Sequence, residues 1–268
     1  MRHFKAVVFD WAGTTIDHGS FAPMGAFVEA FSRFGVAITI LEARVPMGLP
    51  KRAHIAALLA DPGIAARWRE AQGAAPDEAA IDRVYETFVP LNEEVAPRYA
   101  TLVPGTAEAV ARLRAMGLRI GSTTGYVRSI MERILPLAAG QGYAPDNLVC
   151  ADDLPEGRPG PLGMYKCFVD LVVHPPSAVV KVDDTEPGIA EGVAAGCVTV
   201  GVLLSGNHAG MTPEEIAAMS PAERDALRAR VGARLRAAGA QHLVDTVADL
   251  PALIEHLDAA TARPEDVA

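Results

Sequence analysis

Asp10 directly follows the apolar run Ala6–Phe9 and precedes the segment Gly13-Thr14-Thr15. A carboxylate in this position can attack phosphorus and form an acyl phosphate, which divides one difficult displacement into two easier ones. The glycine and the two hydroxyl residues can turn backbone N–H groups toward a phosphate. The alternative is that Asp10 only caps the turn at the end of a strand.

Two other residues are suited to binding a phosphoryl group. Thr124 follows the apolar run 118–122 and can donate a hydroxyl hydrogen bond to a phosphoryl oxygen. Arg158 precedes a helix expected to begin near residue 161, and its guanidinium group could clamp the remaining phosphoryl charge. Together with Asp10, these residues predict a phosphate site.

Adjacent carboxylates, Asp183 and Asp184, follow the apolar run 178–182. With Asp10 they would form the kind of oxygen-rich site that Mg²⁺ prefers. Three carboxylates beside a phosphate would repel it without such a cation. The sequence therefore predicts a Mg²⁺ site next to the phosphate site.

The sequence predicts that the elements carrying these residues form a parallel sheet. Short apolar runs alternate with helical patterns, as in sheets with crossover helices, whose ligands bind beyond the carboxyl ends of the strands. The runs are 6–9, 118–122, 148–150, 178–182 and 198–204, with a further short strand expected at 242–244. We predict an α/β fold: a Rossmann-like core domain of residues 1–19 and 100–268, with an α-helical cap domain, residues 20–99, inserted in it.

The composition excludes several classes of function. The net charge is −9 and no basic tract is present, which argues against a nucleic-acid partner. No apolar run reaches the roughly 20 residues of a membrane span, and the first strand begins too early to leave room for a signal peptide. Three widely spaced cysteines argue against a disulfide framework or a zinc site. A cytoplasmic protein is expected.

The order of the phosphate and metal residues resembles the haloacid dehalogenase (HAD) superfamily of aspartate-nucleophile phosphotransferases. In that family's pattern, D-x-D-G-T, the second aspartate is the general acid that protonates the leaving group. Here that position is Ala12. Hydrolysis of an ordinary phosphate ester would therefore lack its proton donor.

A lysine offers the chemistry that would replace this acid. Cleavage of a carbon–phosphorus bond leaves a carbanion, which a protonated imine formed by a lysine and a neighbouring aldehyde can stabilise. The chain has 24 basic side chains and only four of them are lysines; Lys51 is the one in the helical region. Pro50 fits a first helical position, and both the helix start and adjacent Arg52 would lower the pKa of Lys51. His54 falls on the same helix face and could shuttle protons. The alternatives are a solvated Lys51 and a surface His54.

Five segments together resemble the phosphonoacetaldehyde hydrolase family within the HAD superfamily: FDWAGTTIDHGSFAP, MGLPKRAH, IGSTTGY, GRPGP and KVDDTEPGIAEG. The resemblance implies hydrolysis of phosphonoacetaldehyde to acetaldehyde and phosphate in phosphonate (2-aminoethylphosphonate) degradation. It further implies one Mg²⁺ per subunit, a homodimer, and a small-molecule phosphonate as the partner.

The same resemblance assigns roles to residues. The nucleophile falls on Asp10 and the imine-forming lysine on Lys51. The metal shell falls on the Asp10 carboxylate, the Ala12 backbone carbonyl and Asp184. The remaining assignments are phosphate contacts at Thr124 and Arg158, and aldehyde-side candidates at Met47, His54 and Tyr126.

One match to the family is incomplete. Some members carry a further aspartate four residues after their metal aspartate, and here that position is Gly188. Asp183 is the candidate to supply the missing outer carboxylate, with Asp184 as the direct ligand.

Two other classes of function stay open at the level of sequence. A HAD phosphatase or dehalogenase could act on another substrate, although a dehalogenase would not need the Mg²⁺ site. A non-catalytic phospho-accepting or binding protein would leave Lys51 and the large helical region unexplained.

Overall fold

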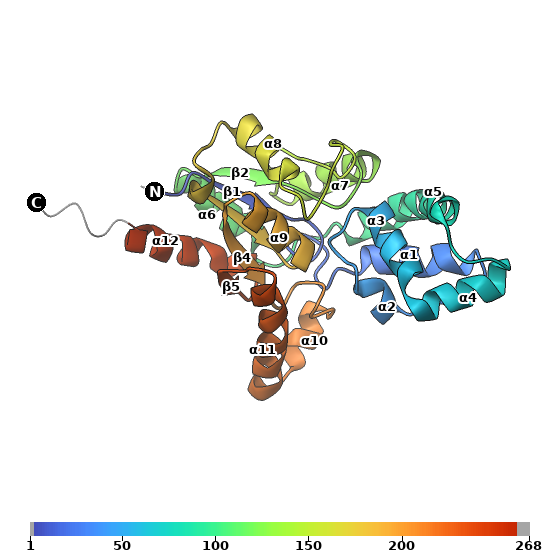
Figure 1. Ribbon diagram of the computed structural model, residues 1–268. Helices are drawn as coiled ribbons and strands as arrows, with labels where there is room; N and C mark the ends of the chain where they lie inside the picture. The colour runs from blue at the N-terminus through green and yellow to red at the C-terminus, as the bar shows by residue number, and fades with distance from the viewer. Residues whose placement is uncertain (1–2, 262–268) are drawn as a thin grey trace, which may run out of the picture.

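The computed structural model describes residues 3–261 and contains a five-stranded parallel sheet (Figure 1). The strand order is β2-β1-β3-β4-β5. The strands are β1 (Ala6–Phe9), β2 (Arg119–Ser122), β3 (Val179–Asp183), β4 (Val198–Val202) and β5 (His242–Val244). The predicted α/β fold class is confirmed, and all five carboxyl ends point to the same edge of the sheet.

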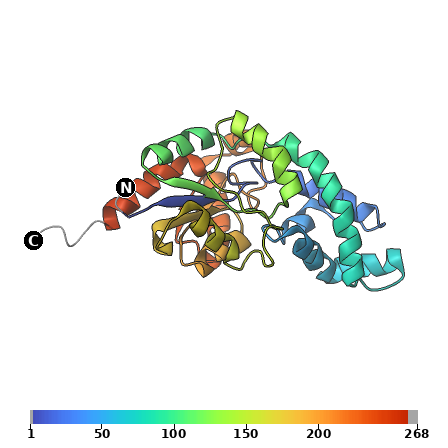
Figure 2. The ribbon, with the colours of Figure 1, turned by 90° about the horizontal axis from the view of Figure 1, so that it is seen from above.

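Helices cover both faces of the sheet because its strands are apolar on both sides. In β1, Val7 and Phe9 pack toward one face while Ala6 and Val8 pack toward the other. Figure 2 shows helices on either side of the sheet. The helices of this part are α6 (Thr106–Ala115), α7 (Arg128–Gly140), α8 (Leu162–Leu171), α9 (Glu186–Ala194), α10 (Pro213–Ala218), α11 (Pro221–Ala237) and α12 (Leu250–Thr261).

A group of helices lies beside the sheet on the side of its carboxyl edge (Figure 1). They are α1 (Ala22–Ser32), α2 (Ile40–Arg44), α3 (Lys51–Ala60), α4 (Pro62–Gln72) and α5 (Glu78–Val95). These helices bury a separate apolar cluster, which includes Phe27, Phe31, Trp68 and Phe88. The helical character predicted for residues 20–99 is present. Their assignment to a separate domain stays a prediction.

One expected strand is absent from the described residues. In the run 148–150, Val149 forms a single parallel bridge with Thr123. The N–H of Cys150 then donates to the carboxylate of Asp153, at 2.8 Å, instead of to a neighbouring strand. The chain turns away after one paired residue, so a strand does not develop. Within residues 3–261, none of the helices is long and apolar enough to cross a membrane.

Candidate active site

Three aspartates meet at the carboxyl edge of the sheet. Asp10 follows β1, Asp183 ends β3 and Asp184 comes next. Adjacent parallel pairing of β1 with β3 brings them together, and their side-chain oxygens lie within 4.8 Å of one another. All three are buried. The predicted cluster of carboxylates is therefore present as geometry.

Burial and mutual repulsion raise the pKa values of two of the three carboxyl groups, Asp10 and Asp184. Burial and the charge of Asp183 raise the pKa of Asp10 to about 6. Burial and the charges of Asp10 and Asp183 raise the pKa of Asp184 well above its ordinary value. Oxygen ligands in this number and this close suit a divalent cation of the Mg²⁺ type, which would offset their repulsion. The residues present thus fit the metal implied by the sequence.

Both oxygens of Asp184 are fixed by hydrogen bonds. The Thr14 hydroxyl donates to Oδ1 at 2.9 Å, and the backbone N–H of Asn207 donates to Oδ2 at 2.7 Å. Each oxygen keeps a free lone pair for a cation. Donors of this kind hold a metal-binding carboxylate in one orientation.

Asp183 faces the cations of the site. Its Oδ2 lies 3.1 Å from Lys181 Nζ and 3.4 Å from the Arg158 guanidinium group. Burial raises the pKa of Asp183, but the charges of Arg158 and Lys181 outweigh burial, so the pKa is lowered overall. This geometry is consistent with an outer role for Asp183 and direct ligation by Asp184.

Gly188 explains where the carboxylate of Asp183 fits. A Cβ atom at residue 188 would lie 1.9 Å from Asp183 Oδ2, well inside van der Waals contact. The carboxylate of Asp183 therefore fills the space that any side chain at residue 188 would need.

Arg158 is buried and bound on three sides. Its Nη1 donates to Asp10 Oδ1 at 2.8 Å, and its Nη2 donates to the backbone and hydroxyl oxygens of Thr123 at 2.8 and 2.7 Å. Its Nε donates to Glu191 at 3.0 Å, and Glu191 also pairs with Lys181 at 3.1 Å. The guanidinium group is thus oriented beside the nucleophile candidate.

Lys51 begins α3 and approaches the same place from the helical group. Its side chain is 5% exposed. Its Nζ lies 4.0 Å from the Met47 sulfur, 5.0 Å from the centre of the Tyr126 ring and 5.9 Å from that of Phe27. Within residues 3–261, no carboxylate forms an ion pair with this amine. Burial lowers the pKa of Lys51 to about 8, although the more distant charge of Asp10 opposes the shift.

The cause of this low pKa differs from the sequence-based expectation. Arg52 was expected to contribute, yet its guanidinium group turns outward and binds Asp82 and Glu78, each at 2.8 Å. Burial is the main cause, with a smaller contribution from Arg158. Pro50 is the residue before the helix instead of its first residue.

A small cavity, partly open to solvent, lies between the two halves of the site. It measures about 20 Å³, enough for one water molecule. Its lining residues are Asp10, Ala12, Met47, Gly48, Lys51, Thr124, Gly125, Tyr126, Arg158 and Thr185. Gly48 permits the close approach of the halves, because a Cβ there would lie 2.3 Å from the Thr185 hydroxyl.

His54 differs from the other predicted residues, since it neither lines this cavity nor belongs to the carboxylate cluster beside it. Its ring stacks on Phe27 with centroids 4.0 Å apart, and its Nε2 lies 2.8 Å from the Ala43 carbonyl oxygen. The side chain is fully buried, so the surface alternative is wrong. Burial and the charge of Lys51 hold the pKa of His54 well below its usual value.

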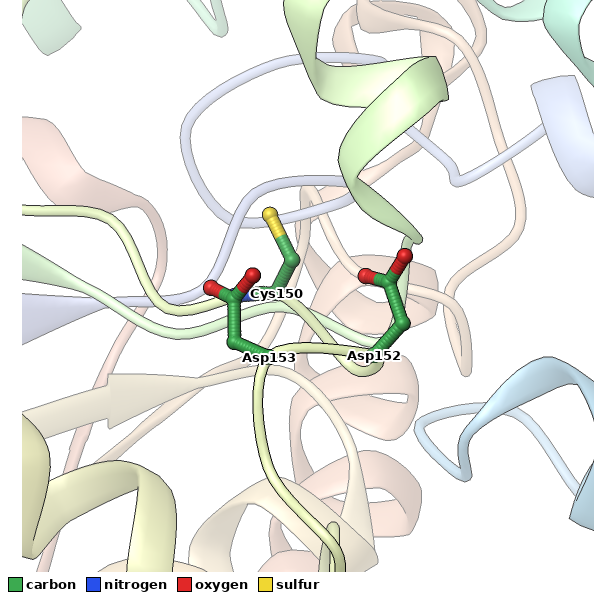
Figure 3. Close-up of side chains that lie close together, drawn as sticks. All are labelled: Cys150, Asp152 and Asp153. Atoms are coloured by element: carbon green, nitrogen blue, oxygen red, sulfur yellow. The ribbon is translucent and has the colours of Figure 1, made fainter.

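A second group of metal-type ligands lies nearby but has other partners. Figure 3 shows Cys150, Asp152 and Asp153 close together in the loop before α8. Asp152 accepts a hydrogen bond from the N–H of Arg128 at the start of α7, and Asp153 pairs with the Arg128 guanidinium group. Burial raises the pKa of the Cys150 thiol to about 12, which disfavours the thiolate that a metal would bind. The carboxylates of Asp152 and Asp153 thus bind the first residue of α7, Arg128, through its backbone N–H and its guanidinium group.

Comparison with known proteins places the chain in a family. Residues 4–196 match the family model of haloacid dehalogenase-like hydrolases. Proteins named phosphonoacetaldehyde hydrolase are 51% identical over 265 residues in Paraburkholderia phytofirmans and 47% identical over 267 residues in Klebsiella pneumoniae, with 99% of each chain covered in both cases. The crystal structure of a phosphonoacetaldehyde hydrolase-like protein from Oleispira antarctica has a TM-score of 0.95 and 41% identity, covering 98% of this chain and 95% of that one. The chain belongs to the phosphonoacetaldehyde hydrolase family.

The sequence motifs resembled the same family, so the family predicted from the sequence is confirmed. The structure brings nine of the ten predicted site residues to the cavity or to the carboxylates beside it, and leaves His54 outside both, stacked on Phe27. The roles assigned to these residues stay predictions.

Sequence reasoning missed Glu191 and Asn207. Glu191 lies in the middle of α9, where a glutamate normally faces water; only its burial among Arg158, Lys181 and Thr123 gives it a place in the site. Asn207 acts through its backbone N–H, which no side-chain pattern reveals. The sequence offers no signal of the burial of Glu191.

Proposed function

We propose that this protein hydrolyses the carbon–phosphorus bond of phosphonoacetaldehyde to acetaldehyde and phosphate, through an imine on Lys51 and an acyl phosphate on Asp10. The observation that carries the proposal is the cavity shared by Lys51 and Asp10. An amine with a pKa of about 8 and a carboxylate at a strand end face one small space from opposite sides. The names of the relatives support the same substrate.

The reaction begins at the amine. Neutral Lys51 condenses with the substrate aldehyde, which releases one water and gives an imine that takes up a proton. A carboxylate oxygen of Asp10 then attacks phosphorus in line with the bond to carbon. The electron pair of the breaking bond enters the protonated imine, which becomes an enamine.

Two hydrolyses restore the protein. The enamine takes a proton on carbon, and water cleaves the resulting imine to acetaldehyde and the free lysine. A second water cleaves the acyl phosphate and releases phosphate from Asp10. Because one water forms with the imine and two are consumed, the net reaction consumes one water.

The residues of the core would orient the phosphonate. Thr124 can donate its hydroxyl hydrogen to a phosphonate oxygen, and Arg158 offers a second charged donor beside Asp10. One Mg²⁺ per subunit, held by the Asp10 carboxylate, the Ala12 carbonyl and Asp184, would neutralise the charge shared by the nucleophile and the phosphonate. Asp183 would hold Arg158 from outside this shell.

The aldehyde would lie on the side of α3. Met47 and Tyr126 line the cavity around Lys51 and leave little room for water beside the amine. His54, stacked on Phe27 outside the cavity lining, would relay protons as a neutral neighbour of Lys51. Ala12 leaves no acid for an alkoxide leaving group, and this favours the phosphonate over a phosphate ester.

The site must open before the substrate can enter. The substrate has seven non-hydrogen atoms, whereas the cavity holds about one water. We therefore propose that residues 20–99 act as a cap that moves relative to the core of residues 1–19 and 100–268. We also propose, from the resemblance, a cytoplasmic homodimer that acts in 2-aminoethylphosphonate degradation.

Borohydride reduction in the presence of phosphonoacetaldehyde tests the proposal. Reduction should trap the imine as a secondary amine, and peptide mass mapping should place the adduct on Lys51. Phosphonoacetaldehyde without borohydride serves as the unreduced control. Phosphate release with no adduct on Lys51 would contradict the imine mechanism.

A further inference from the structure

The loop after β4, residues 203–212, contacts both the metal-type carboxylates and the chain that enters α1. The backbone N–H of Asn207 donates to Asp184 Oδ2 at 2.7 Å. Two residues earlier, the carbonyl of Ser205 accepts a hydrogen bond from the N–H of Gly19 at 2.7 Å. Any shift of this loop would therefore move the N–H group that holds the carboxylate of Asp184.

An arginine of the helical group binds this loop. Arg44, the last residue of α2, donates through Nη1 to the side-chain oxygen of Asn207 at 3.0 Å and to its carbonyl at 3.1 Å. The Asn207 amide donates back to the Arg44 carbonyl at 3.2 Å. The same Nη1 donates to the Gly19 carbonyl at 2.7 Å, and the guanidinium group lies 5.1 Å from the centre of the Phe21 ring. Asn207 is 2% exposed, and Arg44 is half-buried.

We propose that Arg44 and Asn207 form a positioning pair that links the closed arrangement of α1–α5 to the orientation of the Asp184 carboxylate. The inference rests on the proposed function, because it takes Asp184 to be a metal ligand. Neither residue lines the cavity, so both act through Asp184. When α2 lies against the core, its arginine holds Asn207 in place, and the N–H of Asn207 then holds Oδ2.

The sign of the effect separates this role from simple electrostatics. Arg44 is close enough to Asp184 for their charges to interact. By Coulomb's law alone, removing the positive charge of Arg44 would strengthen the binding of a divalent cation. Loss of a positioning pair would weaken that binding, because the carboxylate would no longer be held. Asn207→Ala provides the same test without a change in charge, since it keeps the backbone N–H and removes the side chain that binds Arg44.

The experiment is a direct titration of the full chain with Mn²⁺ followed by electron paramagnetic resonance, without substrate. Arg44→Ala and Asn207→Ala should each raise the Kd for Mn²⁺ about tenfold, the range usual for lost partners of a metal ligand. The double variant should resemble either single variant, because each already breaks the pair. Arg33→Ala, which removes an exposed arginine paired with Glu29 on α1, should leave the Kd unchanged.

Each single variant removes one partner of the pair. Thermal unfolding checks that each variant is folded. An unchanged or lower Kd in folded Arg44→Ala and Asn207→Ala would overturn the positioning pair and leave the proposed function standing. Additive effects in the double variant would also overturn it. Absence of Mn²⁺ binding by the unsubstituted protein would contradict both the proposed metal site and the pair.

Discussion

Two buried lysines occupy contrasting regions of the molecule. Lys181, in the middle strand of the sheet, is fully buried, and its Nζ pairs with Asp183 and Glu191, each at 3.1 Å. Lys51, at the start of α3, is nearly as buried, but its amine faces a thioether sulfur and two aromatic rings. Burial is common to both lysines, whereas carboxylate partners are present only at Lys181.

The presence or absence of carboxylate partners decides whether a buried lysine is suited to a structural or to a chemical role. Carboxylates around a buried ammonium group offset the cost of removing it from water. An amine that lacks them lowers the cost by giving up its proton, and it then becomes a nucleophile at neutral pH. The sheet edge thus holds compensated charges, and the helical group holds an amine without a carboxylate partner among the described residues.

The largest expected effect is on catalysis. Lys51→Arg keeps a cation at the start of α3 but cannot form an imine, so we expect kcat to fall by a factor of about 10⁴ or more. Lys166→Arg, at an exposed residue of α8 paired with Asp170, is the matched control and should leave kcat unchanged. Measurement of phosphate release decides the matter. Comparable turnover in Lys51→Arg and Lys166→Arg would remove the distinction between the two regions.

The next largest effect is on stability and concerns the other lysine. Lys181→Met would leave Asp183 and Glu191 without one of their cations, so we expect the free energy of unfolding to fall by about 3–5 kcal/mol. Denaturant unfolding at pH 7 measures this change. A variant as stable as the unsubstituted protein would mean that Arg158 alone compensates the carboxylates.

The corresponding substitution at Lys51 should have the opposite sign. Lys51→Met removes an uncompensated amine from apolar surroundings, so we expect the free energy of unfolding to rise by about 2 kcal/mol at pH 7. Because the pKa of Lys51 is lower in the folded protein than in the unfolded chain, the gain should be full below pH 8 and disappear as the pH approaches about 10.5. Denaturant unfolding at several pH values measures both parts. A stability loss at pH 7 would show that the amine has a partner when folded.

The smallest effect is a pH dependence of the reaction. With a pKa of about 8, roughly one Lys51 amine in ten is neutral at pH 7 and one in a hundred at pH 6. We expect kcat/KM to fall about tenfold between pH 7 and pH 6. A profile that is flat from pH 6 to pH 8 would contradict a neutral amine as the attacking group.

The core half of the site could be predicted from the sequence because strand ends in a parallel sheet share one edge. Asp10, Thr124 and Asp183 each follow an apolar run, so the pattern of runs alone predicts that they lie together. How deeply each side chain of the helical group is buried could not be predicted from the sequence. Spacing placed His54 on the face of α3 that carries Lys51, but its ring stacks on Phe27 and does not line the cavity. Glu191 escaped notice because its position in the middle of a helix gives no sign of tertiary contacts.

The contact between Asp183 and Gly188 also constrains the order in which mutations can accumulate. A methyl group at residue 188 would overlap the carboxylate at residue 183, so Asp183 and a side chain at 188 are mutually exclusive. A lineage that moved the outer carboxylate to residue 188 would have to lose Asp183 first and pass through an ancestor with neither carboxylate. Asp183→Gly and Gly188→Asp should therefore show sign epistasis: the second change is harmful alone and beneficial after the first.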